Sequence, residues 1–377
     1  MNNETIKGFK DYTGEEAEKR AVIQEVIRQT FEKYGFQPAE TPIIEAEEFV
    51  KGNNQNDEAV RDIFKLQDRG NRKLALIYEF TFQLKRIAKG KKLPYKRYQI
   101  GYVFRDEPIR EGRTRQFVQC DADIIGSTIK DEAENLSMFK EVFKSLGIDV
   151  VIYINNRKLL NGILQENGFP NNREEIIREL DKLDKLSKEQ VKENLKSYKA
   201  EILVDVLTKP TQSFTKYKAY SEVQELETYC KLFGIEVKFR PFLARGFSYY
   251  NGSVFEVWSK KINVSLCGGG SYLIDGIQAT GISFGLEPIA LLTNMKLQLE
   301  KYLIVSLGQD RKTIQLAQQL RKKSKNVSIY YGKPSKALEY ANAYKINNVI
   351  FVGETEVKKK IFKVKIMSTG REIKLKV

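Results

Sequence analysis

The chain has 377 residues, which predicts two to three domains at roughly 150 residues each, and its 41% hydrophobic and 30% charged residues are typical of a globular protein. Of its net charge of +15, residues 301–377 contribute 18 Lys and Arg minus 5 Asp and Glu, or +13, and a basic module of this kind is typical of nucleic-acid binding. The absence of histidine excludes Ser-His-Asp and Cys-His catalysis. Because Cys120, Cys230 and Cys267 are also far apart, we expect neither a disulfide framework nor a metal site built from Cys or His.

The chain has no segment suited to a membrane. No apolar run approaches the ~20 residues of a membrane-spanning helix. The N-terminus is polar and charged, which excludes a signal peptide. We therefore expect a cytoplasmic protein with no membrane partner.

The first half of the chain is predicted to combine helices and strands. Thr13 and Glu16 have the spacing of a capping box, and apolar residues recur at helical spacing from there until Gly35, which predicts a long amphipathic helix. The extended segment 36–44 contains Pro42, which removes a ladder donor and predicts an edge or an interface. Further along we predict helices at 82–89 and 131–146 and strands at 74–77, 97–106, 117–125 and 149–154.

Residues 157–213 differ from their surroundings, because Leu, Ile and Val recur at helical spacing between charges with almost no strand signal. They are predicted to form a helical insertion. Short connections indicate an antiparallel sheet after it, with strands at 236–241, 254–258, 263–267 and 279–284 and then a helix at 286–297. From Tyr302 onward the alternation predicts a small α/β domain with a mainly parallel sheet.

The most informative segment is the predicted hairpin at residues 98–126. One strand delivers Arg105, the loop contains Arg110, Arg113 and Arg115, and alternation places four side chains of the second strand on one face: Phe117, Gln119, Asp121 and Asp123. Guanidinium groups beside an aromatic ring suit a nucleotide, since Arg binds phosphates bidentately and the ring stacks on a base. Taken alone, this segment is better explained as an exposed hairpin whose arginines form surface salt bridges.

Two glycine-containing segments, 243–256 and 267–286, strengthen the nucleotide interpretation. They add Arg and Tyr residues flanked by glycines that permit close backbone approach. A lone run such as Gly268–Gly270 more often marks a bulge or turn than a ligand site. The three segments together indicate a binding site.

These segments resemble the motifs of class II aminoacyl-tRNA synthetases, and most closely those of the histidyl-tRNA synthetase family. KGFKDYTGEE resembles the N-terminal entry of that family, FQPAETPIIE its motif 1, and VFRDEP through GRTRQFVQCDADIIG its motif 2 in the archaeal and eukaryotic form. LARGFSYYNGSVFE resembles the R-G-L-D-Y-Y-T-G signature, which is the most specific of these motifs, and GISFGLEP resembles motif 3. Residues 301–377 resemble the anticodon-binding domain, so the resemblance covers nearly the whole chain.

The resemblance implies an α+β fold and a two-step reaction. The catalytic domain is expected at 1–156 and 214–298, with a six-stranded antiparallel sheet flanked by helices, the helical insertion at 157–213 and the anticodon-binding α/β domain at 301–377. Histidine would react with ATP, with Mg²⁺ accompanying the nucleotide, to give histidyl-adenylate, and the 3' end of tRNA(His) would then take the histidyl group. A homodimer through motif 1 is also implied.

The resemblance also implies residue roles. Arg105 and Arg245 would be the catalytic cations at the α-phosphate. Glu107 and Arg113 would bind ATP at the adenine and the distal phosphates, and Phe117 would stack on the base. Glu79, supported by Thr81, falls where the family keeps an acid for the α-amino group of the substrate. The other residues expected around histidine are Gln119, Asp123, Tyr249, Tyr250 and Tyr272.

The chain departs from the family pattern at four positions. Pro288 replaces the arginine of motif 3, Ile77 an arginine two positions before Glu79, Ser248 the aspartate of R-G-L-D-Y-Y, and Ser271 the arginine of R-Y-D. The loss of the motif 3 guanidinium predicts weaker ATP binding. Two alternatives to a histidine ligase remain, a non-aminoacylating regulatory paralogue and a synthetase for another amino acid. The retained basic domain and both arginines favour the enzyme over the first, and the R-G-x-x-Y-Y signature disfavours the second.

Overall fold

The computed structural model describes residues 3–52, 58–109, 114–245, 249–262, 264–295 and 300–375. They form two compact units, Met1–Met295 and Lys296–Val377. Arg110, Arg113 and Ser248 lie outside the described residues. Within the described part of the chain, no helix has the length and apolar character needed to cross a membrane.

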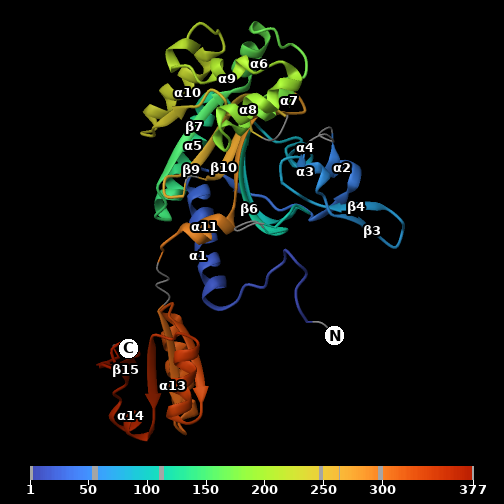
Figure 1. Ribbon diagram of the computed structural model, residues 1–377. Coiled ribbons are helices and arrows are strands. Elements are labelled where there is room, and N and C mark those ends of the chain that lie inside the picture. Colours follow the sequence, from blue (N-terminus) through green and yellow to red (C-terminus); the bar gives the residue numbers. More distant parts are fainter. Residues whose placement is uncertain are drawn as a thin grey trace. The chain divides into compact units, whose positions relative to one another are not determined.

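A mixed sheet forms the centre of the first unit (Figure 1). Its six central strands pair antiparallel, and one short strand pairs parallel at each edge, β1 with β5 and β8 with β7. The predicted six-stranded antiparallel sheet is thus confirmed, with two edge strands added. In spatial order the strands are β1 (Gln37–Pro38), β5 (Tyr95–Phe104), β6 (Gln116–Ile125), β11 (Ile277–Gly285), β10 (Ser265–Ile274), β9 (Tyr250–Ser259), β7 (Val150–Asn156) and β8 (Val237–Phe239).

Helices cover one face of this sheet and leave the other for polar side chains. Ile23, Ile27 and Phe31 of the first helix lie in one apolar core with Phe139 of the fifth and with every second residue of β6. Between them, Gln119, Asp121 and Asp123 point to the opposite face, so the middle of the strand has one apolar and one polar side. The helices that contribute to this core include α1 (Gly14–Lys33), α5 (Ile129–Ser145), α10 (Tyr220–Leu232) and α11 (Leu286–Leu292).

The predicted first helix is confirmed, but its predicted capping box is wrong. Thr13 is the N-cap residue, yet its side chain makes no capping hydrogen bond. Glu16 instead forms an ion pair with Lys10 at 2.7 Å. The helix ends before Gly35, whose φ of +80° is the left-handed conformation that stops a helix at low cost.

Two predicted strands have different lengths in the structure. Within segment 36–44 only β1 and the first residue of β2 pair in a sheet, whereas the strand predicted at 263–267 continues as β10 through the glycine run to Ile274. A second sheet of order β2-β4-β3 lies beside three short helices. These elements are β2 (Ile44–Ala46), β4 (Lys73–Leu76), β3 (Lys65–Gln67), α2 (Glu47–Lys51), α3 (Glu58–Arg61) and α4 (Leu84–Ile87).

Residues 157–213 are helical, as predicted from their periodicity. Their apolar residues, among them Leu160, Ile177 and Leu203, join the core of the first unit. The segment comprises α6 (Arg157–Glu166), α7 (Arg173–Leu180), η1 (Asp181–Asp184), α8 (Lys188–Leu195), η2 (Lys196–Tyr198), α9 (Ile202–Leu207) and η3 (Thr211–Phe214).

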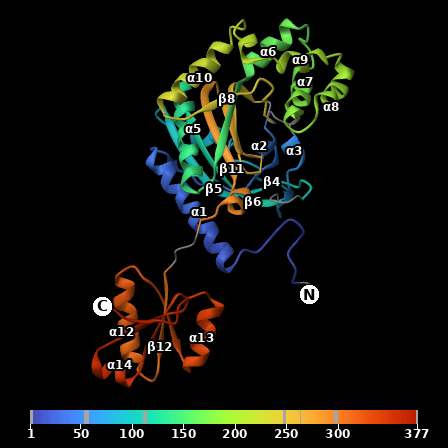
Figure 2. The same cartoon turned by 60° about the vertical axis from the view of Figure 1, so that its left-hand side comes forward.

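The second unit is an α/β sandwich with the sheet order β13-β12-β14-β15-β16. The first three strands in this order are parallel to one another. Strand β15 pairs antiparallel with both of its neighbours, β14 and β16. Helices α12 and α14 cover one face of the sheet and α13 the other (Figure 2). The bounds are β12 (Lys301–Ser306), α12 (Asp310–Lys322), β13 (Asn326–Tyr331), α13 (Pro334–Ala343), β14 (Asn348–Val352), α14 (Glu354–Lys359), β15 (Lys363–Ile366) and β16 (Glu372–Lys374).

Candidate active site

Strand register gathers polar residues into one row across the open face of the large sheet. Asp121 on β6 pairs with Ser283 on β11, Ser283 pairs with Gly268 on β10, and Gly268 pairs with Glu256 on β9. Directly paired residues of antiparallel strands point to the same face. The row therefore forms part of one surface, although its members are far apart in the sequence.

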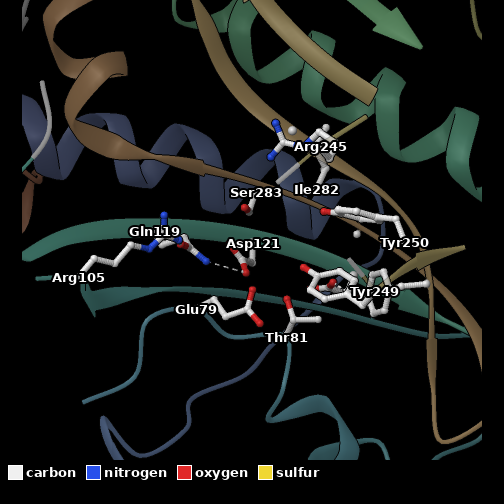
Figure 3. A pocket seen from close by; sticks show the side chains of 14 residues that line it. Glu79, Thr81, Arg105, Gln119, Asp121, Arg245, Tyr249, Tyr250, Ile282 and Ser283 are labelled. Atoms are coloured by element: carbon white, nitrogen blue, oxygen red, sulfur yellow. Dashed lines mark hydrogen bonds between the residues drawn. The ribbon is translucent and has the colours of Figure 1, made fainter. Parts of the chain in front are cut away.

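Two adjoining cavities lie over this surface. The larger has a volume of about 450 Å³. Figure 3 shows the residues that line the smaller cavity and labels most of them. The two cavities share five of their lining residues, which therefore form the boundary between them: Arg105, Gln119, Arg245, Gly268 and Ser283.

Arg105 follows β5 directly and is held by two hydrogen bonds. Its Nε donates to the backbone oxygen of Tyr78 at 3.1 Å, and one terminal nitrogen donates to Oε1 of Gln119 at 3.2 Å. The guanidinium carbon lies 5.1 Å from the centre of the Phe117 ring. Arg105 and Phe117 are thus fixed side by side on the wall of the larger cavity.

Arg245 reaches the boundary from the segment between β8 and β9. Its guanidinium lies 2.5 Å from Oε1 of Glu256, whose other oxygen accepts a hydrogen bond from Trp258 Nε1 at 2.7 Å. Burial is the largest single influence and would lower the pKa of Arg245, but Glu256, Tyr250 and Asp181 together outweigh it and raise the pKa, so the group remains a cation. Its backbone φ of +74° lies in the left-handed region, which is uncommon for a residue other than glycine.

The glycines of β10 and β11 leave room for these side chains. A Cβ on Gly268 would lie 2.2 Å from the guanidinium carbon of Arg245, and one on Gly270 would lie 2.7 Å from Cδ1 of Tyr250. A Cβ on Gly281 would lie 2.0 Å from Oδ1 of Asp123. The glycine run is therefore part of β10, where its three residues pair regularly with β9 and leave room for neighbouring side chains, and a register shift follows between Gly270 and Tyr272.

The deep end of the smaller cavity contains a buried ion pair. Arg97 on β5 is fully buried and lies 2.8 Å from Oδ2 of Asp123. The Tyr272 hydroxyl donates a hydrogen bond to Oδ1 of the same carboxylate. Burial raises the pKa of Asp123, and Arg97 and Tyr272 act against this increase. Arg97 was not among the residues predicted from the sequence.

Three tyrosines lie close together in the lining of the smaller cavity. The ring centres of Tyr249 and Tyr250 lie 4.7 Å apart, and that of Tyr272 lies 5.5 Å from the Tyr249 ring. Burial raises the pKa of all three phenols, so each keeps its proton near neutral pH and can donate a hydrogen bond.

The structure brings together all but one of the predicted site residues. Glu79, Thr81, Gln119, Asp123, Tyr249, Tyr250 and Tyr272 line the smaller cavity, and Arg105, Glu107, Phe117 and Arg245 line the larger. The exception, Arg113, lies outside the described residues. Additional lining residues that the sequence prediction did not include are Asp62, Asp121, Asp181, Lys185 and Glu256.

Of the departures from the family pattern that the structure describes, two lie behind the cavity walls and the third lies beside the larger cavity. Ile77 is buried in an apolar cluster that Phe117 joins, and the Ser271 hydroxyl donates to the buried carboxylate of Glu132. Burial raises the pKa of that carboxyl to about 7. Pro288 is partly exposed near the start of α11, beside Gly285 of the larger cavity.

Comparisons with known proteins match both units of the chain. The family model for histidyl-tRNA synthetase matches residues 8–289, and the model for an anticodon-binding domain matches residues 301–377. The chain is 35% identical over 416 residues to histidine–tRNA ligase 1 of Bacillus cereus strain ATCC 10987, covering 100% of this chain and 95% of the relative.

Solved structures share the fold. The crystal structure of histidyl-tRNA synthetase from Nostoc sp. PCC 7120 matches with a TM-score of 0.86 at 24% identity, covering 100% of this chain and 97% of that chain. An ATP phosphoribosyltransferase regulatory subunit/histidyl-tRNA synthetase from Bacillus halodurans C matches with a TM-score of 0.76 at 21% identity, covering 93% of this chain and 98% of that chain. Because both kinds of protein share the fold, the structural likeness does not distinguish a ligase from a regulatory relative. The family model and the sequence relative that covers the whole chain do make this distinction, and they show that the chain belongs to the histidyl-tRNA synthetase family.

Proposed function

We propose that this histidine–tRNA ligase activates histidine with ATP at the boundary of the two cavities and then transfers the histidyl group to tRNA. The smaller cavity would hold histidine and the larger ATP. The observation that carries this assignment is that Arg105 and Arg245 line both cavities. Two cations at the junction lie where the substrate carboxylate and the α-phosphate must meet.

In the first step, a carboxylate oxygen of histidine attacks the α-phosphorus, and the bond to the bridging oxygen of pyrophosphate breaks. Negative charge accumulates on the α-phosphate oxygens in the transition state. Arg105 and Arg245, each fixed beforehand by hydrogen bonds or an ion pair, would stabilise that charge without reorganisation. No side chain acts as the nucleophile, so a chain without histidine can perform the step.

The larger cavity has groups suited to the rest of ATP. Phe117 offers a ring for adenine, and Glu107 lies on the same wall. Mg²⁺ is usually held by phosphates, waters and one or two carboxylates. Asp62 and Glu107 would hold it with the phosphates, where it would neutralise part of their charge, even though three metal-ligating side chains do not cluster anywhere in the described ranges.

Histidine would lie with its carboxylate between the two arginines and its ring at the deep end. Glu79 and Thr81 would bind the α-ammonium. Asp123 and Tyr250 would contact the imidazole nitrogens, because an acid and a phenol are suitable partners for them. Gln119, Tyr249 and Tyr272 complete the pocket.

In the second step, a hydroxyl of the terminal adenosine of tRNA(His) attacks the carbonyl carbon of the adenylate, and AMP leaves. The basic second unit would bind the anticodon arm through its net charge of 18 − 5 = +13 over residues 301–377. Both steps belong to protein synthesis, so we place the reaction in the cytoplasm.

We also propose that the chain forms a homodimer through the segment that resembles motif 1. Ile43 and Ile44 both lie in this segment and are 44% and 50% exposed. Such exposure is unusual for adjacent isoleucines and suits a protein interface. A monomer mass in analytical ultracentrifugation at micromolar concentration would contradict this proposal.

The proposed activity is tested by pyrophosphate exchange into ATP with each of the twenty amino acids. We expect exchange with histidine alone. Exchange with a different amino acid would show a different synthetase, and no exchange with any of them would favour a regulatory protein.

Changing Gly268 to Ala should lower histidine-dependent exchange by about 10-fold or more, because a Cβ 2.2 Å from the Arg245 guanidinium must displace that cation. Gly162→Ala is the matched control, since an added Cβ in α6 meets nothing within 4 Å. Equal exchange rates for the two variants would show that the position of the guanidinium does not limit activation.

Changing Pro288 to Arg should lower the KM for ATP by about 10-fold, because a guanidinium that reaches a phosphate contributes ~1 to 3 kcal/mol. Residue 288 is the third residue of α11 and lies beside Gly285 of the larger cavity, so the new side chain can reach it. Pro288→Ala separates loss of the proline from gain of the cation. If both variants have the same KM in exchange kinetics, the missing arginine does not weaken ATP binding in this chain.

A further inference from the structure

Asp121 is a buried carboxylate in the smaller cavity that the roles above leave unused. It is 3% exposed and lies on β6 between Gln119 and Asp123. Its Oδ2 accepts a hydrogen bond from Gln119 Nε2 at 3.1 Å, whereas Oδ1 has no hydrogen-bond partner among the described residues. Figure 3 shows the carboxylate in the middle of the labelled side chains. A buried acceptor of this kind calls for a donor from a bound molecule.

The polar residues of β6 mark depth along the cavity. Gln119 accepts a hydrogen bond from Arg105 and so lies at the reacting end, whereas Asp123 is held by Arg97 and Tyr272 at the deep end. Alternate residues of a strand are about 7 Å apart, so Asp121 lies one such step from each. With the carboxylate of histidine at Arg105 and its ring beside Asp123, the α-ammonium group is at the level of Asp121.

The charges around Asp121 favour a cationic partner at this level. Burial raises the pKa of Asp121 well above its usual range, Arg97 acts against this, and the carboxylates of Asp123 and Glu79 raise it further. Asp123 already has Arg97 as its counter-ion at 2.8 Å. Glu79 is 4% exposed and lines the same cavity. A cation between Asp121 and Glu79 would offset both the burial and the mutual repulsion of these two carboxylates.

We propose that Asp121 and Glu79 together bind the α-ammonium group of histidine, which makes Asp121 a further substrate-binding residue of the reaction. The inference rests on the proposed function, because that function assigns the smaller cavity to histidine. It predicts that Asp121 contributes to the binding of any ligand that has the ammonium group and nothing to that of a ligand without it.

The experiment compares two ligands by calorimetry on the full chain, without ATP. Histidinol keeps the ring and the ammonium group, whereas 3-(imidazol-4-yl)propionate keeps the ring and lacks the ammonium. Asp121→Asn should raise the dissociation constant of histidinol by about 10- to 100-fold, as expected for a lost hydrogen bond between charged groups. It should raise the dissociation constant of the propionate by less than about 2-fold. Asp205→Asn is the control, because Asp205 is an exposed carboxylate paired with Lys192 in the helical segment.

Several outcomes would overturn the proposal. An equal loss for both ligands would place Asp121 at the ring or give it a structural role, and no loss for either would remove it from the site. If a thermal melt shows that Asp121→Asn does not fold, Asp121→Glu replaces it, because this variant keeps the charge but displaces it. Asp121→Glu must then weaken the binding of histidinol more than the binding of the propionate. A wild-type chain that binds histidinol but shows no exchange would contradict the proposed function and leave this inference standing, whereas one that binds neither ligand would overturn it.

Discussion

Changing Arg245 to Ala is expected to lower histidine-dependent pyrophosphate exchange by ~10² or more while the protein stays folded. The variant removes one of the two cations that line both cavities, and with it the charge nearest to Glu256. Because the guanidinium would act mainly on the transition state, the turnover number should fall more than the KM values rise. Exchange kinetics over a range of ATP and histidine concentrations measure both.

Arg86→Ala provides the matched control for this variant. Arg86 forms a surface ion pair with Glu45 at 2.6 Å and lines neither cavity, so its loss should change exchange by less than about 2-fold. Circular dichroism separates a folding defect from a catalytic one. Near-normal exchange by the Arg245 variant would exclude this residue as a catalytic cation.

Removal of residues 296–377 is expected to lower tRNA charging by ~10² or more and to change histidine-dependent exchange by less than about 3-fold. The reason is that each unit has its own core, and both cavities are lined only by residues of the first unit. Charging of tRNA and pyrophosphate exchange on the same truncated protein measure the two effects.

The isolated second unit completes this experiment. Residues 296–377 should fold alone and bind tRNA weakly, and the logarithm of the binding constant should fall linearly with the logarithm of the salt concentration. Full charging by the truncated protein would refute the role given to the basic unit. Binding that does not change with salt would refute its electrostatic basis.

The sequence predicted the polar face of β6 well because that prediction needed only local information. Strand alternation has a period of two, so Phe117, Gln119 and Asp123 had to share a face wherever the strand lay. The long first helix was predicted for the same reason, from the spacing of its apolar residues. Its capping box failed because the Glu16 carboxylate pairs with Lys10, a contact that helical spacing does not reveal.

What the sequence could not supply depends on register and on contacts between distant segments. Arg97 could be recognised as the partner of Asp123 only after β5 and β6 were aligned, because that register pairs the two residues. Gly268 could not be distinguished from an ordinary turn glycine until Arg245 was found lying over it. Asp121 was on the predicted face, but its open oxygen became visible only when the partners of its neighbours were known.

The left-handed backbone at Arg245 has a consequence for how this family can change over time. Glycine and asparagine adopt such a conformation more readily than arginine, whose Cβ costs about 1 kcal/mol there. Neither of those residues has a cation, so, if Arg245 acts as proposed, its backbone conformation and the reaction favour different residues at this position. A lineage released from the need to activate histidine would relieve this backbone strain by losing Arg245 once Glu256, its largely buried partner, had also been replaced. Glycine or asparagine at this position in a related chain would therefore mark a protein that has abandoned the reaction while keeping the fold.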